Sequence, residues 1–195
     1  DPQASSLGWR NNAGEDNLLG FDVIALPNST LHKDLPSIAG KSDYEAILID
    51  CPPGGANRSR SDDITRSALM AANVVLIPVQ PSPLDYQAAI TMLPLLQDTV
   101  VYKPDLMIWI LINRRLSGNN RLGRDARDAA QEFFSADGLK IRVMNSEIAA
   151  RSALAESSGR GRTILTYAGG SLAAYEFRQL TEEVIECLVT PSLEA

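Results

Sequence analysis

Five continuously apolar runs of strand length recur along the chain, separated by longer stretches with helical spacing. The runs are FDVIAL, EAILID, NVVLIPV, LMIWILIN and KIRVM, at residues 21–26, 45–50, 73–79, 106–113 and 140–144. Apolar residues occupy successive positions rather than alternate ones, which is typical of strands covered on both faces. The pattern therefore predicts five buried strands.

Helices are predicted around these strands, at residues 61–72, 84–97, 121–135, 146–157 and 171–189. Ser61, followed by two aspartates, is a good helix start, and Pro94 predicts a local disturbance within 84–97. The alternation of strands and helices predicts an α/β fold. We expect a mostly parallel, twisted sheet flanked by helices on both faces, forming a single domain over residues 1–195.

The composition limits which kinds of protein and which catalytic chemistry are compatible with this chain. The 195 residues, 45% of them apolar, suffice for one domain, and no apolar run reaches the length of a membrane helix. The first residues have neither the basic start nor the apolar stretch of a signal peptide. Cys51 and Cys187 lie far apart and His32 is the single histidine, so a reducing cytoplasm and carboxylate-based chemistry are expected.

Charge is unevenly distributed along the chain. The net charge of −6 arises in residues 1–100, and residues 101–195 are neutral. Arginines cluster at 114–127 and 151–162, and the planar guanidinium suits phosphate groups. A solvated helix surface, or a bias of the genome, explains the same arginines equally well.

Two predicted strand ends carry candidate nucleotide-binding residues. Asp50 ends one strand and is followed by PPGG, where a carboxylate suits hydrated Mg²⁺ and the glycines let backbone approach a phosphate. Asn113 ends another strand and offers the donor and acceptor that adenine requires. The alternatives are that Asp50 caps a turn and that Asn113 is a turn residue.

In this order the segments resemble the ParA group of deviant Walker-type ATPases, relatives of MinD and of nitrogenase iron protein. The matching segments are DPQ at 1–3, ILIDCPPGG at 47–55, LIPVQPSPLD at 76–85, ILIN at 110–113, and the stretches 146–164 and 171–188. The resemblance covers almost the whole chain. It implies a fold like that of P-loop NTPases.

The resemblance also implies a nucleotide site built with ATP and Mg²⁺. Asp1 matches the aspartate that orients the attacking water, and Asp50 matches the one that acts on Mg²⁺. The contacts it implies to the nucleotide come from Pro52, Gly54, Asn113 and Ile148. In such enzymes ATP bridges two subunits, so a homodimer is expected.

ParA-type proteins bind DNA without sequence preference, through phosphate contacts. The arginines expected to make these contacts are Arg115, Arg121, Arg124, Arg151, Arg162 and Arg178. The resemblance further implies a ParB-like adaptor protein and a cytoplasmic, nucleoid-associated location. No basic residue follows Arg178, so a MinD-like membrane helix is not expected.

Two departures from the ParA pattern stand out. No G-x-x-x-x-G-K-[ST] loop or its deviant form occurs in the sequence, so we expect the chain to begin after that loop and to be inactive as written. Ile148-Ala149-Ala150 stands where the family usually has Ile-Pro-Arg, with arginine only at Arg151, so the chain departs from the family pattern at the base contacts and at the nearby DNA contacts. The alternatives are a ParA-like ATPase that positions a non-DNA cargo, and a non-catalytic binding module that has lost its phosphate loop. A flavodoxin-like domain would share the alternation but not the DPQ, IDCPPGG and ILIN segments in this order.

Overall fold

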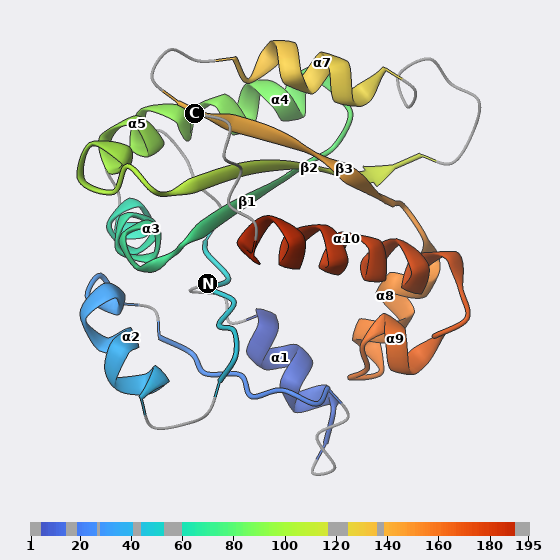
Figure 1. Ribbon diagram of the computed structural model, residues 1–195. Coiled ribbons are helices and arrows are strands. Elements are labelled where there is room, and N and C mark those ends of the chain that lie inside the picture. The colour runs from blue at the N-terminus through green and yellow to red at the C-terminus, as the bar shows by residue number, and fades with distance from the viewer. Residues whose placement is uncertain are drawn as a thin grey trace.

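A computed structural model of the chain describes residues 5–14, 19–26, 28–40, 44–52, 60–116, 125–135 and 139–189. Within this part of the chain, one parallel sheet separates two layers of helices (Figure 1). The helices are α1 (Ser5–Asn12), α2 (Leu31–Ala39), α3 (Arg60–Ala71), α4 (Pro83–Ile90), α5 (Leu93–Tyr102), α7 (Ala126–Phe133), α8 (Ser152–Gly159), α9 (Ile164–Tyr167) and α10 (Leu172–Val189).

Strand β2 (Met107–Arg115) is the centre of the sheet, between β1 (Val74–Val79) and β3 (Ile141–Ala149). Both neighbours pair with it in parallel. These strands confirm the predictions at 73–79, 106–113 and 140–144, and with the helices on both faces they confirm the predicted α/β class.

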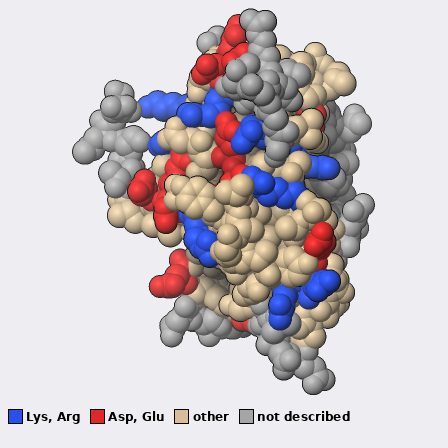
Figure 2. All heavy atoms as spheres, turned by 90° about the vertical axis from the view of Figure 1, so that its right-hand side faces the viewer, with Lys and Arg blue, Asp and Glu red and all other residues tan. Residues whose placement is uncertain are grey.

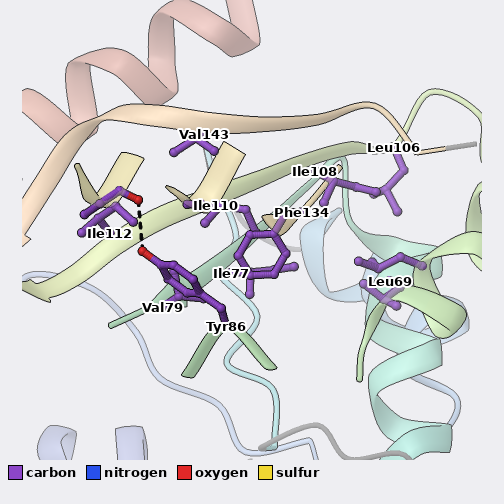
Figure 3. Packing of buried hydrophobic residues seen from close by; sticks show 13 residues of the cluster. Leu69, Ile77, Val79, Tyr86, Leu106, Ile108, Ile110, Ile112, Phe134 and Val143 are labelled. Carbon is purple, nitrogen blue, oxygen red and sulfur yellow. Dashed lines mark hydrogen bonds between the residues drawn. The ribbon is translucent and has the colours of Figure 1, made fainter. Parts of the chain in front are cut away.

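Alternate side chains of β2 enter two separate cores, as the pleat of a strand requires. Ile108, Ile110 and Ile112 pack under α3, α4, α5 and α7, where Figure 3 shows them around Tyr86 and Phe134. The Tyr86 hydroxyl donates a hydrogen bond of 3.0 Å to the backbone carbonyl of Ala126, which ties α4 to the start of α7.

The opposite face of the sheet is covered by α10 (Figure 1). Trp109 and Leu111 of β2 meet Leu180 and Cys187 of that helix. Near the start of α10, Ile164 of α9 packs with two buried alanines of α10. Burial on both faces is what continuously apolar strands require, and α10 confirms the helix predicted at 171–189.

The predicted strands at 21–26 and 45–50 are wrong. Both segments lack regular secondary structure and belong to no strand ladder of the described residues. Their apolar side chains remain exposed, by 58% at Ile24 and 94% at Leu48. An apolar run indicates a tendency to burial, whereas a strand also requires a hydrogen-bonded neighbour, and here none is paired to these segments.

Two helix predictions also need correction. Residues 84–97 form α4 and α5 instead of one helix, because Pro94 cannot donate to residue 90 and its ring clashes with that carbonyl. Pro94 instead lies in the first turn of α5, where no donor is needed. Residues 146–149 continue β3, and α8 begins only at Ser152. By contrast, α3 matches the prediction at 61–72, and α7 the described part of 121–135.

Candidate functional site

The Asp50 carboxylate lies at the end of the segment 44–50 and contacts α1. The Ser6 hydroxyl donates to Asp50 Oδ2 over 2.6 Å. Asp1 lies outside the described residues, so its predicted role in orienting the attacking water stays a prediction. Helix α1, which begins four residues after Asp1, nevertheless brings Ser6 onto Asp50.

The residues after Asp50 turn inward. Cys51 is partly buried and Pro52 is buried. Burial raises the pKa of the Cys51 thiol above its ordinary value, and the neighbouring Asp50 carboxylate acts in the same direction. Cys51 is therefore a neutral thiol near pH 7 rather than a nucleophilic thiolate. Gly54 lies outside the described residues.

One carboxylate with a hydroxyl partner fits what Mg²⁺ requires beside a nucleotide. Mg²⁺ keeps several waters and is usually bound through one or two carboxylates plus substrate phosphates, rather than in a protein cage. Among the described residues, no group of three or more His, Cys, Asp or Glu forms such a cage. Asp50 is exposed, so its oxygens can meet a hydrated ion.

Asn113 and Ile148, the residues predicted to contact the base, lie near the ends of β2 and β3. Asn113 Oδ1 accepts a 2.9 Å hydrogen bond from the backbone N–H of Arg114, so this acceptor is engaged by the next residue of β2. Arg114 has φ +52°, a left-handed conformation unusual for a non-glycine residue. The Ile148 side chain is only 2% exposed and packs in the core under α10.

Strand β3 departs from regular pairing with β2 before it reaches this edge. Val143 is opposite Ile110 but Glu147 is opposite Ile112, so β3 bulges between them. Glu183 of α10 accepts hydrogen bonds of 2.7 Å from the backbone N–H groups of Asn145 and Ser146 at the bulge. The carboxylate therefore replaces the strand partner that these two groups lack.

A second glutamate of α10 supports the end of β3. Glu176 accepts from the Ala149 N–H over 3.1 Å and pairs with Arg151 at 2.6 Å. Glu176 and Glu183 are seven residues apart, which places them on the same side of α10, two turns from each other. The sequence predictions missed both carboxylates, although acidic residues on the apolar, buried face of a helix are a readable signal.

The predicted DNA-contacting arginines are not equivalent. Arg115 pairs with Glu147 and Arg151 with Glu176, each at 2.6 Å and with both partners partly buried. Arg178 donates to the Gly169 carbonyl but is exposed, as is Arg162. Arg121 and Arg124 lie outside the described residues. Figure 2 shows separate basic groups with acidic side chains among them, rather than one continuous basic surface.

A cavity of about 310 Å³ opens between the loop after β1 and α7. Pro81, Pro83 and Tyr86 line one side, and Ala129 and Phe133 line the other. An apolar lining suits an apolar side chain rather than phosphates. Among the described helices, none is long and apolar enough to cross a bilayer.

No protein-family model matches the chain. The chain is 25% identical over 186 residues to the maintenance of carboxysome distribution protein A of Halothiobacillus neapolitanus, covering 95% of this chain and 80% of that protein. It is 28% identical over 150 residues to the sporulation initiation inhibitor protein Soj of Bacillus subtilis, covering 75% of this chain and 54% of Soj. An ATP complex of Cyanothece McdA matches 63% of this chain and 46% of that one, with 18% identity and a TM-score of 0.47.

At 25% and 28% identity, both curated relatives are similar to this chain over most of its length, as expected of a chain that resembles ParA-type ATPases. The resemblance predicted from the DPQ, ILIDCPPGG and ILIN segments is thereby confirmed. The chain spans 80% of the length of the first relative and about half, 54%, of the second.

Proposed function

We propose that this chain belongs to an ATPase that binds Mg²⁺–ATP between two subunits and uses hydrolysis to position a DNA cargo. The observation that carries the proposal is the Ser6–Asp50 contact, which joins the segment after DPQ to the end of ILID. Phosphoryl transfer relies on positioning and charge stabilisation, so a held carboxylate is the expected contribution of these residues. No G-x-x-x-x-G-K-[ST] motif occurs among the 195 residues, so the proposal assigns the phosphate cradle to none of them.

The proposal includes an active form that is a homodimer, with Asn113 near the base and Asp1 at the attacking water. In this view the protein is cytoplasmic and associates with the nucleoid, recruited there by non-specific DNA binding and released by a ParB-like adaptor. Exposed Arg162 and Arg178 support the DNA contacts better than Arg115 and Arg151, whose charges are already paired.

Asp50→Asn is expected to lower Mg²⁺-dependent ATP turnover at least about tenfold, because it removes the charge that attracts the hydrated ion. The measurement is phosphate release by the protein that the complete gene encodes. Asp105→Asn, an exposed aspartate before β2, is the matched control and should keep full turnover. Full turnover in the Asp50 variant would reject the assignment of the site.

Arg162→Glu and Arg178→Glu are each expected to weaken ATP-dependent DNA binding about fivefold or more, because phosphate contacts dominate such binding. Fluorescence anisotropy with duplexes of unrelated sequence, at about 50 and 200 mM salt, measures the effect. Lys140→Glu, which makes the same charge change at the start of β3, is the control. If all three variants bind as the wild type does, these arginines do not form the DNA surface.

A non-DNA cargo is the second candidate, favoured by the relative named for carboxysome distribution, of which the match covers 80%. ATP turnover without DNA binding in the wild-type protein would support it. A non-catalytic binding module is the remaining alternative, and the absence of ATP turnover in the complete protein would favour it.

A further inference from the structure

Helix α1 is a short element whose position depends on contacts at its far end. Its eight residues include no buried side chain, and a helix of this length is not stable alone. The Trp9 indole donates to the Arg162 carbonyl over 3.2 Å and packs edge-on against Phe21 at 5.7 Å. The hydrogen bond fixes α1 against the loop between α8 and α9, and the ring contact fixes it against the segment 19–26.

The loop between α8 and α9 lies very close to the backbone at the end of α1. Gly161 has φ +62°, and a Cβ at this position would lie 2.2 Å from the backbone of Asn12 and Ala13. Its N–H bonds to the Ser158 carbonyl, and the Arg162 N–H bonds to the Ser157 carbonyl, which is a Schellman cap of α8. The capped end of α8 therefore supports the end of α1.

With its far end fixed, α1 presents Ser6 to Asp50. The Ser6 hydroxyl donates to one carboxylate oxygen over 2.6 Å, a short hydrogen bond to a charged acceptor. A donor of this kind restricts the rotation of the carboxylate. Hydrogen bonds from neighbouring groups orient metal-binding carboxylates in this way, and losing one typically weakens metal binding about 10–100-fold.

We propose that Ser6 is a positioning residue for Asp50, held in place by the Trp9 and Gly161 contacts of α1. This inference rests on the proposed function, because it concerns the binding of the metal–nucleotide complex at Asp50. It assigns no chemistry to Ser6 itself. Its role is to fix the carboxylate so that hydrated Mg²⁺ meets it in one orientation.

The test measures metal affinity directly, in the protein that the complete gene encodes. Mn²⁺, which replaces Mg²⁺ and is visible by electron paramagnetic resonance, is titrated in the presence of the non-hydrolysable ATP analogue AMP-PNP. Ser6→Ala is expected to weaken Mn²⁺ binding about tenfold, and Ser6→Thr, which restores a hydroxyl, should recover most of it. Ser158→Ala, an exposed serine whose hydroxyl bonds within its own helix, is the control.

A double-mutant cycle separates positioning from general structural damage. Trp9→Phe keeps a ring against Phe21 but removes the donor to the Arg162 carbonyl, so a smaller loss of Mn²⁺ affinity is expected. In the Ser6→Ala background, Trp9→Phe should have no further effect, because the hydroxyl that α1 positions against Asp50 is then already absent. Additive losses, or equal Mn²⁺ affinity in Ser6→Ala and wild type, would overturn the inference alone. A wild-type protein that binds no Mn²⁺–AMP-PNP would overturn the proposed function and this inference with it.

Discussion

Glu183→Ala is expected to lower the free energy of unfolding by about 3 kcal/mol, because two partly buried N–H groups lose their acceptor together. The Glu183 carboxylate accepts hydrogen bonds of 2.7 Å from Asn145 and Ser146, and Arg142 lies 4.0 Å from it. The residue is only 9% exposed, so water does not readily replace these bonds. Urea unfolding followed by circular dichroism measures the loss.

The pH dependence of stability gives a second readout for Glu183. Burial alone would raise the pKa of this carboxyl, but the hydrogen bonds from Asn145 and Ser146, with help from Arg142, outweigh burial and lower the pKa below its ordinary value. A lowered pKa contributes stability that is present above the ordinary glutamate value. That stability is lost as the pH falls through the pKa of the folded state.

Two variants control for this prediction. Glu186→Ala removes an exposed carboxylate one turn further along α10 and should change stability by less than about 0.5 kcal/mol. Glu183→Gln keeps an acceptor but no charge, so an intermediate loss is expected, with a weaker dependence on acid. Wild-type stability in Glu183→Ala would mean that the bulge of β3 does not depend on α10.

The central sheet could be predicted from the sequence because its strands carry their own signal. NVVLIPV and LMIWILIN are apolar at nearly every position, and both are covered by helices on two faces. FDVIAL and EAILID carry almost the same signal, yet neither joins the sheet of the described residues, and Ile24 and Leu48 are exposed. Hydrophobicity predicts that a segment tends to be buried, but the partner it pairs with lies elsewhere in the chain.

The extent of β3 illustrates the same limit at the level of single residues. Residues 146–149 were predicted to be helical, but the Glu183 and Glu176 carboxylates accept the N–H groups of Ser146 and Ala149 and favour the extended form. The residue pattern at 146–149 does not indicate these acceptors, because they belong to α10, more than 25 residues later along the chain. Tertiary contacts here override local preference.

A candidate site residue could be selected from the sequence where its signal lies within one segment. It could not be selected where its role depends on a contact between two segments. Asp50 could be selected because a strand-like run, a carboxylate and PPGG follow one another. Ser6 lies 44 positions away from it, and nothing in its own surroundings marks it out. Likewise, the arginine clusters were visible, but the pairing of Arg115 with Glu147 depends on the register of β2 and β3.

Gly161→Ala is expected to destabilise the protein by about 2–4 kcal/mol, because the added Cβ both disfavours the left-handed backbone and clashes with a neighbouring segment. A left-handed conformation costs an alanine about 1–2 kcal/mol, and φ at Gly161 is +62°. The new Cβ would also lie 2.2 Å from the backbone of α1's end, a separation that real Cβ atoms do not show. Either α1 or the loop must move, and the Trp9–Arg162 hydrogen bond is the contact that breaks.

Stability and tryptophan exposure measured together decide whether this loop holds α1. In Gly161→Ala, acrylamide should quench Trp9 fluorescence more strongly, whereas Trp109, which is 3% exposed, gives a constant background. Gly159→Ala, two residues earlier in open space, is the matched control and should be neutral or stabilising by up to about 1 kcal/mol, since alanine favours the helix. If Gly161→Ala kept both the stability and the quenching of the wild type, α1 would be held by contacts other than this loop. If quenching rises, Mn²⁺ affinity should fall as in Ser6→Ala, because the same displacement withdraws the Ser6 hydroxyl from Asp50.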